Sequence, residues 1–346
     1  DRRALAEVDA LLAAEGIRRD PHLDYICAAR DDDGHIIATG SAFESTLRCF
    51  AVSHEHQGEG LLNTVLSHLM EHELMRGCTG VSLYTKPKSA KFFGDLGFHE
   101  IARVDGLVFM ENEREGFSRC LARFERETAA FCAEKGIARP TAAETAAIVM
   151  NANPFTRGHQ SLVARAAQEN TLVHLFLVSE DASFFPYRVR EQLVRAGIAS
   201  FPNVVLHASG PYIISSATFP SYFLKDDETV SRTHAALDIA VFSRIAEALG
   251  IGRRYIGEEP FSETTAIYND VMQAALPKSG VECITVKRAE AEGRAISASE
   301  VREQLREEDF ETIAALVPET TLAFLQSNEA RPIIEKLKAA NDVRHH

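Results

Sequence analysis

Residues 146–168 read AAIVMNANPFTRGHQSLVARAAQ, and this stretch decides the fold of the second half of the chain. The apolar, partly β-branched run Ala146–Asn151 predicts a buried strand, whereas Gln160–Gln168 has the spacing of an amphipathic helix. A short turn that contains a proline, a threonine and a glycine separates the two. The order of strand, turn and helix predicts an α/β unit.

The same alternation continues toward the C-terminus. Each further apolar run is followed by a segment with helical spacing, and parallel neighbours need such crossover connections. We therefore expect a doubly wound parallel (Rossmann-like) sheet, in which ligands bind beyond the carboxyl ends of the strands. The further strands are expected at Thr171–Ser179, Val204–Ala208, Arg254–Ile256 and Val281–Val286.

The first part of the chain predicts a smaller α/β domain, in which Leu61–Arg76 is the clearest helix. A charged segment with helical spacing follows it and predicts a connecting helix. The expected organisation is a domain over 1–116, a connecting helix or linker over 117–143 and the parallel-sheet domain over 144–346. The strands of the first domain are expected at Tyr25–Ala29, Ile36–Thr39, Phe43–Phe50, Gly80–Tyr84 and Gly106–Met110.

Composition excludes several classes of protein. The 346 residues suit two domains of ordinary size, and 50 acidic against 37 basic side chains give a net charge of -13. That charge disfavours a nucleic-acid partner and an anionic membrane surface. No apolar run approaches the length of a membrane span, and the six cysteines are scattered without a C-x-x-C pair. We therefore expect a soluble protein of the reducing cytoplasm.

The turn after the first strand of the second half has the residues that phosphate recognition needs. Thr156, Gly158 and His159 provide a hydroxyl, a close backbone approach and an imidazole at a helix start, where exposed N–H groups attract anions. Taken alone, the same residues also suit a capped helix with a surface histidine.

A second candidate lies after the last strand, in residues 296–302, ISASEVR. Ser297, Ser299 and Arg302 would grip a polyphosphate together with the helix N-terminus. The alternative is an ordinary helix start in which Ser299 caps the helix. The two motifs together are more informative than either one alone.

Together, T-x-G-H after a strand and I-S-x-S-x-x-R at a late helix start resemble the nucleotidyltransferase superfamily. Further stretches narrow the resemblance to the citrate lyase ligase family, and they follow in order over most of residues 144–330. Those stretches are Met150–His159, Phe184–Tyr187, Tyr212–Ser215, Phe219–Lys225, Gly257–Pro260 and Tyr268–Asn269.

The resemblance implies an acid-thiol ligase in which ATP and acetate form acetyl-adenylate and release pyrophosphate. The thiol of the CoA-derived prosthetic group, on the acyl carrier (gamma) subunit of citrate lyase, then takes the acetyl group and releases AMP. His159 and Thr156 would donate to the α- and β-phosphates. Ser297, Ser299 and Arg302 would hold the β- and γ-phosphates, with Mg²⁺ bridging phosphate oxygens.

Six further residues are candidates for ligand binding. Arg190 and Lys225 lie near predicted strand ends, where a cation would orient acetate or a phosphate, and the alternative for each is a surface charge. Four residues at strand ends are expected to line the nucleotide pocket, namely Asn151, Asn153, Gly257 and Glu258.

The first domain is similar to the acetyl-CoA-dependent N-acetyltransferase fold. Gln57–Leu62 resembles its pyrophosphate loop, and Ala90–Phe98 resembles its late A-x-x-F-Y-x-x-x-G-F stretch. Two departures are Leu62, where the family usually has a small residue, and Phe93, where it often has a tyrosine that acts as a general acid. We therefore expect a retained fold that docks a CoA-like arm instead of transferring acetyl groups itself.

Other interpretations stay open. An acetate ligase for the acyl carrier protein of malonate decarboxylase, a nucleotide-coenzyme adenylyltransferase and a non-enzymatic carrier-docking module share parts of the pattern. Residues 68–72 spell H-x-x-E-H, but no further ligand is apparent, so a metal site is not expected. A basic docking face for an acidic carrier is expected at Arg253, Arg254, Lys287 and Arg288.

Overall fold

The computed structural model describes residues 2–138, 140–213, 219–222, 224, 226–258, 263–291 and 293–340. The chain forms two compact units. Unit 1 comprises Asp1–Arg119 and Phe219–Thr233, and unit 2 comprises Cys120–Thr218 and His234–His346. A segment from the second half of the sequence therefore belongs to the first unit.

Unit 1 is built on a six-stranded sheet in the order β1-β2-β3-β4-β6-β5. Neighbouring strands are antiparallel except for β3 and β4, which are parallel. All five predicted strands are present with shifted ends, and β5 is an addition that its charged and polar residues hid from the apolar pattern. The strands are β1 (Tyr25–Arg30), β2 (Ile36–Phe43), β3 (Thr46–Val52), β4 (Ser82–Thr85), β5 (His99–Val104) and β6 (Leu107–Glu111).

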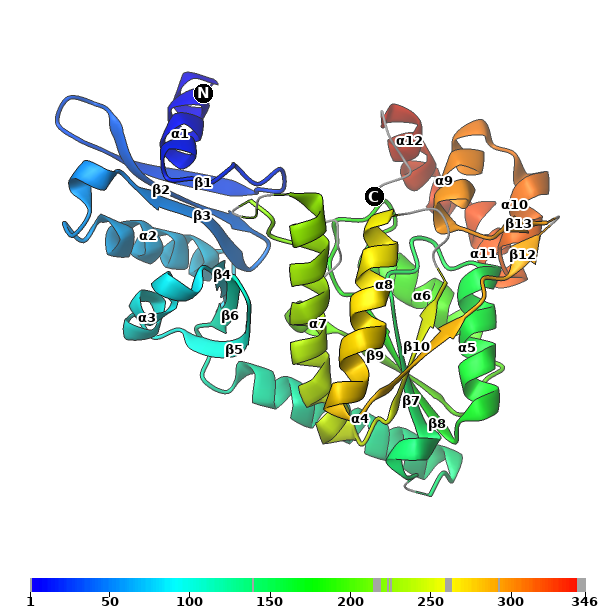
Figure 1. The fold of residues 1–346 in the computed structure, drawn as a ribbon. Helices are drawn as coiled ribbons and strands as arrows, with labels where there is room; N and C mark the ends of the chain where they lie inside the picture. The colour runs from blue at the N-terminus through cyan, green and yellow to red at the C-terminus, as the bar shows by residue number, and fades with distance from the viewer. Residues whose placement is uncertain are drawn as a thin grey trace. The chain divides into compact units, whose positions relative to one another are not determined.

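Helices cover both faces of this sheet, which lies at the blue and cyan end of the chain in Figure 1. On one face, Leu69 of α2 and Phe93 of α3 belong to the larger apolar cluster. On the other face, Leu12 of α1 belongs to a cluster with Cys49 and Ala51 of β3. The helices are α1 (Arg2–Ala14), the 3-10 turn His54–His56, α2 (Leu61–Met75) and α3 (Pro87–Asp95).

The segment Phe219–Thr233 adds to the face that α1 covers. Tyr222 is buried in the same apolar cluster as the α1 side chains. The backbone N–H of Arg18 donates to the carbonyl of Tyr222 at 2.8 Å, and its guanidinium donates to the carbonyls of Ser221 at 3.4 Å and Leu224 at 3.3 Å. The predicted range 144–346 assigned this segment to the parallel-sheet domain, because local patterns carry no information about such a distant packing partner.

Unit 2 contains a five-stranded sheet in the order β11-β10-β7-β8-β9. Every neighbouring pair is parallel, which confirms the doubly wound fold, and all five predicted strands are present. The chain runs from β7 outward to β9 and then crosses to β10, so β7 and β10 flank the point where strand order reverses. Ligands of such sheets bind at this point. The strands are β7 (Thr145–Met150), β8 (Leu172–Leu177), β9 (Val204–Ala208), β10 (Arg253–Gly257) and β11 (Glu282–Val286).

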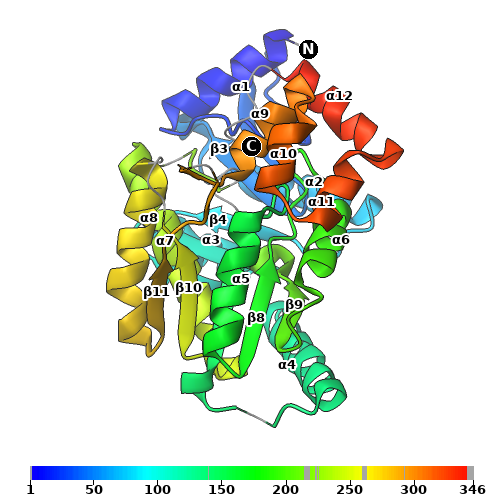
Figure 2. The same ribbon diagram turned by 90° about the vertical axis from the view of Figure 1, so that its right-hand side faces the viewer.

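Helices also cover both faces of the second sheet, and Figure 2 shows α5 lying across one of them. That face carries α5, α6 and the C-terminal helices, which share one apolar cluster with β7 and β8. On the other face, Phe124 of α4 meets Phe176 edge-on, and Phe242 of α7 lies under the guanidinium of Arg254. The helices are α4 (Gly116–Lys135), α5 (Arg157–Glu169), α6 (Tyr187–Ile198), α7 (Asp227–Leu249), α8 (Glu263–Ala275), α9 (Ala298–Glu307), α10 (Phe310–Leu316), α11 (Glu319–Leu325) and α12 (Arg331–Ala339).

Short elements connect these layers. The predicted connecting helix is observed as α4, and a 3-10 turn over Ala142–Glu144 leads from it into β7. Between β11 and α9, the strands β12 (Glu290–Ala291) and β13 (Arg294–Ala295) form a two-stranded antiparallel ribbon. This ribbon turns the chain back toward the edge of the sheet where β7 and β10 end.

Candidate functional site at the reversal point of the parallel sheet

The turn between β7 and α5 forms a capped helix start. Thr156 is the N-cap of α5, and its Oγ1 accepts a hydrogen bond from the backbone N–H of His159 at 3.3 Å. In return, the backbone N–H of Thr156 donates to Nδ1 of His159 at 3.1 Å. The two residues hold each other in place at a helix N-terminus, where backbone N–H groups remain available to an anion.

His159 is held in one protonation state. Because Nδ1 accepts the hydrogen bond from Thr156, the neutral ring carries its proton on Nε2. Burial, together with the positive charge of Arg288, lowers the pKa of His159 to about 4. The ring is further fixed by stacking on Phe155, with 5.7 Å between centroids. At neutral pH, His159 is therefore a neutral hydrogen-bond donor.

The two sequence motifs lie side by side. A Cβ atom built on Gly158 would lie 3.3 Å from the backbone carbonyl of Ile296. That separation is tighter than most Cβ contacts, so a glycine at this position permits the close approach of two distant segments. The starts of α5 and α9 therefore meet in unit 2.

The start of α9 is capped by a different serine from the one the sequence suggested. Ser297 is the N-cap, and its side chain accepts from the backbone N–H of Glu300 at 3.1 Å. Ser299 lies in the first turn, where its Oγ accepts from Nη2 of Arg302 at 3.4 Å. Arg302 is only 3% exposed, and its Nη1 donates to the carbonyl of Asn153 at 2.6 Å. The guanidinium thus holds the β7–α5 turn from the α9 side.

Arg190 is not the surface charge of the alternative interpretation, and its predicted role in orienting a ligand stays a prediction. Its side chain is fully buried, and its N–H groups donate to protein oxygens at the ends of β7 and β8. Asn151 and Asn153 belong to the same network. Nδ2 of Asn151 donates to Oγ of Ser183 at 3.0 Å, and Oδ1 of Asn153 accepts from the N–H of Phe185 at 3.1 Å. These three side chains hold the turn.

The carboxyl end of β10 forms the other side of the reversal point. The carbonyl of Gly257 accepts a hydrogen bond from Nδ2 of Asn269 at 3.1 Å. The carbonyl of Glu258 accepts one from Nε of Arg288 at 2.8 Å, and its N–H donates to the carbonyl of Val286 at 2.9 Å. The backbone after β10 is therefore tied to the backbone after β11.

Arg288 is a candidate ligand residue of this site. The sequence pattern assigned it instead to the basic docking face. The carbonyl of its neighbour Ala289 accepts from the N–H of Ile296 at 2.9 Å, and Ile296 is the residue that meets Gly158. The charge of Arg288 also contributes to the lowered pKa of His159. Arg288 thus lies with the α5 and α9 starts. The rule that strand ends carry ligand residues would have selected it, because it is the second residue after β11.

The predicted basic docking face is wrong for one of its members. Arg254 is 3% exposed and forms a buried ion pair with Asp238 at 2.6 Å, so it cannot present its charge to a carrier. Arg253 and Lys287 each form an ion pair with a glutamate at the surface. Lys225, predicted to orient acetate or a phosphate, lies outside the described residues.

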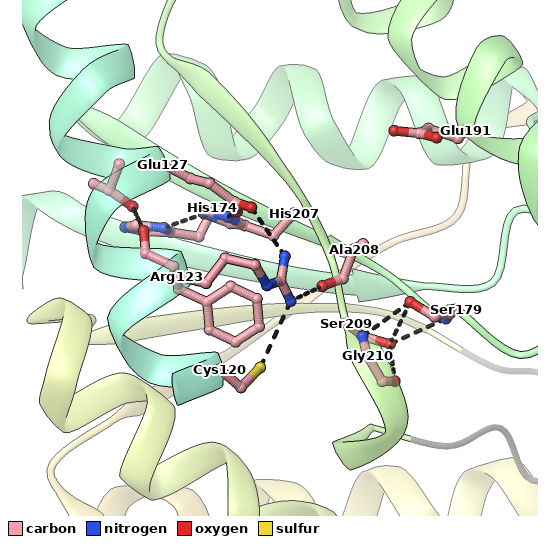
Figure 3. Close-up of polar contacts among 12 residues, drawn as sticks. Cys120, Arg123, Glu127, His174, Ser179, Glu191, His207, Ala208, Ser209 and Gly210 are labelled. Atoms are coloured by element: carbon pink, nitrogen blue, oxygen red, sulfur yellow. Dashed lines mark hydrogen bonds and ion pairs between the residues drawn. The ribbon is translucent and has the colours of Figure 1, made fainter. Parts of the chain in front are cut away.

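A buried polar chain joins α4 to the edge strand β9 (Figure 3). Nδ1 of His207 lies 2.6 Å from Oε2 of Glu127 on α4, and Nε2 of His207 lies 3.1 Å from Nδ1 of His174. Burial lowers the pKa of both histidines, and in His207 it outweighs the opposing effect of Glu127. Both rings are therefore neutral, with each Nδ1–H directed to the next acceptor in the chain.

This polar chain continues through Arg123 of α4. Its Nη1 donates to Oε1 of Glu127 at 2.9 Å, and its Nη2 donates to the carbonyl of Ala208 at 2.8 Å. The donors and acceptors lie on the sheet face opposite α5. We therefore assign the chain to the attachment of α4 and not to the α5–α9 site.

In unit 1, the loop Gln57–Leu62 connects the turn after β3 to α2. Gly58 and Gly60 adopt φ values of 93° and 79°, which favour glycine, and Gly60 caps α2. Phe93 is 3% exposed and packs in the apolar core of unit 1. The backbone of the loop thus depends on its two glycines, and Phe93 is a core residue.

The H-x-x-E-H motif forms an aromatic stack. Nε2 of His68 lies 2.8 Å from the hydroxyl of Tyr25, and the ring of His72 stacks on Tyr25 with 3.7 Å between centroids. Among the described residues, one group has metal-ligand spacing, the cluster of half-buried Asp31 with exposed Asp33 and His35. None of the helices described here is long and apolar enough to cross a membrane.

Comparison with known sequences gives the family. The profile of the citrate lyase ligase C-terminal domain matches residues 145–325. The chain is 39% identical over 296 residues to citrate (pro-3S)-lyase ligase of Klebsiella pneumoniae, which covers 84% of this chain and 83% of that protein. It is 34% identical over 335 residues to the protein of the same name from Escherichia coli strain K12. That match covers 94% of this chain and 92% of that protein.

Solved structures resemble the N-terminal region. One is an acetyltransferase of the GNAT family from Staphylococcus aureus Mu50, at 17% identity, covering 32% of this chain and 93% of that chain with a TM-score of 0.28. Another is the ribosomal-protein-S18-alanine N-acetyltransferase from Escherichia coli, at 17% identity. It covers 32% of this chain and 88% of that chain with a TM-score of 0.27. The family assignment depends on the sequence matches, which span both units. The chain belongs to the citrate lyase ligase family.

Proposed function

We propose that the protein uses ATP and acetate to acetylate the prosthetic-group thiol on the acyl carrier subunit of citrate lyase, releasing AMP and pyrophosphate. The names of its relatives support a ligase that acts on citrate lyase. The observation that carries the proposal is the meeting of the α5 and α9 starts at Gly158 and Ile296. Two helix N-termini beside a reversal point suit a polyphosphate.

The net charge of -13 does not oppose ATP binding. Screening confines the field of distant charges to about 10 Å at moderate salt, so local groups decide the sign at the site. The local groups are the two helix N-termini and Arg288, whose charge already acts on His159. The same residues fit the triphosphate of ATP by charge and by hydrogen-bond donors.

The chemistry needs no nucleophile from the protein. A carboxylate oxygen of acetate attacks the α-phosphorus, the bond to the β-phosphate oxygen breaks, and pyrophosphate leaves with the electron pair. The carrier thiolate then attacks the acetyl carbonyl, and AMP leaves. Catalysis of the first step consists of positioning the reactants and stabilising charge on the transferring phosphoryl group.

His159 has the properties that this charge stabilisation requires. Its proton is on Nε2, and its low pKa keeps the ring neutral, so it donates a hydrogen bond without carrying a full charge. Thr156 orients the ring, and Arg302 holds the preceding turn through Asn153. We assign Arg288, Ser297 and Ser299 to the β- and γ-phosphates, where bound Mg²⁺ would neutralise further charge.

The backbone of Gly158, Gly257 and Glu258 borders the adenosine part of ATP in this proposal. Unit 1 would receive the carrier's CoA-derived arm, and its loop Gln57–Leu62 would meet the phosphates of that arm. We place the reaction in the cytoplasm, where CoA-derived thiols stay reduced.

The test is acetate-dependent exchange of pyrophosphate into ATP. Loss of one transition-state donor typically costs about 10²–10³ in rate, so His159→Ala should reduce exchange by that factor while the variant still folds. Wild-type exchange in this variant would refute the site. Purified carriers of citrate lyase and of malonate decarboxylase, offered separately, decide which one receives the acetyl group.

A further inference from the structure

Arg190 lies in the first turn of α6 and is fully buried. Its guanidinium donates to oxygens from separate parts of the chain. Nη1 donates to the carbonyl and to Oδ1 of Asn151, both at 2.9 Å, and to the carbonyl of Val178 at 2.8 Å. Nε donates to the carbonyl of Phe185 at 3.0 Å, and Nη2 donates to the carbonyl of Glu180.

These acceptors come from two loops. Asn151 follows β7, whereas residues 178–185 follow β8, so one side chain links the carboxyl ends of adjacent strands. Two further hydrogen bonds join the same loops, from Asn151 to Ser183 and from the Phe185 N–H to Asn153. The β7–α5 turn is therefore attached to the β8–α6 loop through Arg190.

The turn is also held from its other side. Arg302 donates to the carbonyl of Asn153 at 2.6 Å, and Thr156 follows three residues later at the cap of α5. Two buried guanidinium groups thus restrain the backbone that leads into His159. Any displacement of Asn151–Asn153 would move the His159 ring with the cap.

We propose that Arg190 is a positioning residue for adenylate formation, which acts on the reaction only through the placement of the β7–α5 turn and His159. The inference rests on the proposed function. A planar guanidinium directs several N–H groups to acceptors on different sides, and a lysine ammonium cannot reproduce that arrangement. Arg190→Lys keeps the charge and most of the volume but releases the turn.

The experiment measures acetate-dependent ATP–pyrophosphate exchange in Arg190→Lys. Because a misplacement of about 1 Å can cost 10²-fold in rate, kcat should fall by roughly that factor while the KM for ATP changes little. The matched control is Arg195→Lys on the same helix, where the side chain is 61% exposed and pairs with Glu191. Arg195→Lys should exchange like the wild type. A raised KM with unchanged kcat in Arg190→Lys would instead mean direct ligand binding and would overturn the proposal.

A double-mutant cycle tests whether the effect passes through His159. If Arg190 acts only by placing that ring, Arg190→Lys in a His159→Ala background should slow exchange no further. If Arg190→Lys slows exchange in the His159→Ala background by the same factor as in the wild type, the inference is overturned. The proposed function is then still intact. Wild-type exchange in His159→Ala refutes the proposed site, whereas absence of acetate-dependent exchange in the unaltered protein refutes the proposed function.

A second variant keeps the proposal testable if Arg190→Lys does not fold. Asn151→Ala removes one acceptor of Arg190 and retains the buried cation. We expect a loss in kcat of about 10-fold that disappears in the His159→Ala background. A loss confined to KM, or one that persists in that background, counts against a positioning role.

Discussion

The backbone carbonyl of Ile296 lies 3.3 Å from the place that a Cβ atom would occupy on Gly158, and Oγ1 of Thr156 lies 3.4 Å from the same place. The absence of a side chain at residue 158 therefore allows the α9 segment to approach the cap of α5. Both motifs that suggested phosphate binding depend on this contact, because it places their helix starts together.

Gly158→Ala should slow ATP–pyrophosphate exchange by about 10-fold or more, because the new methyl group pushes the two helix starts apart. The unfolding free energy should change by less than about 1 kcal/mol. Alanine favours the helix over glycine by about that amount, which offsets the cost of the steric contact. Urea unfolding and exchange rates measure the two effects. Gly94→Ala in α3, where a Cβ would meet nothing within 4 Å, is the control and should leave exchange unchanged. An equally active Gly158→Ala would contradict the close contact.

Thr156→Val should destabilise the protein by about 1 kcal/mol and slow exchange, because the Oγ1 that accepts from the His159 N–H is lost. Thr156→Ser retains this acceptor and should behave nearly as the wild type. Thermal unfolding and exchange kinetics compare the pair. If valine and serine gave the same rate, the cap would have no part in holding His159.

Arg288→Gln should raise the pKa of His159, because the charge of Arg288 helps to lower it. The same change should slow exchange by about 10-fold if Arg288 contacts a phosphate. Titration of His159 by NMR measures the first effect. Arg253→Gln, which removes a surface charge paired with Glu282, is the matched control and should alter neither quantity. An unchanged pKa of His159 in Arg288→Gln would mean that the charge of Arg288 does not act on the His159 ring.

Lys287→Glu should weaken acetylation of the carrier and leave pyrophosphate exchange within about twofold of the wild type. The side chain of Lys287 is 80% exposed, and a reversed charge there would repel an acidic carrier. Carrier acetylation at two salt concentrations checks this, since salt should narrow the difference between variant and wild type. A parallel loss of exchange would place Lys287 in the nucleotide site.

Lowering the pH below about 6.5 should destabilise unit 2. Burial lowers the pKa of His174 and His207 in the folded protein, so the unfolded chain binds protons that the folded chain does not. The free energy of unfolding should therefore decrease as the pH falls below the ordinary pKa of histidine. The decrease is up to about 1.4 kcal/mol per pH unit for each such ring. Urea midpoints at pH 7.5 and 5.5 measure the slope. His207→Asn should flatten it, and an unaltered slope would show that His207 is not buried in its neutral form.

The elements that the sequence predicted are those encoded by neighbouring residues. The strand at Ala146–Asn151, the helix that follows it and the Thr156 cap depend on side-chain periodicity and on contacts within a few residues. The burial of Arg190 and Arg254 was not predicted, because charged residues are usually exposed. Their burial depends on carbonyls and a carboxylate from other segments, which no local pattern reveals.

The sequence by itself determined that the second half is a parallel α/β sheet and that the starts of α5 and α9 carry the residue types that phosphate recognition needs. Only the tertiary structure decided that these starts meet at Gly158 and Ile296, that Arg288 joins them, and that Phe219–Thr233 packs in unit 1. The physical reason is the range of the interactions. Periodicity and capping act over one or two helical turns, whereas the direction in which a guanidinium donates is set by whichever distant backbone packs against it.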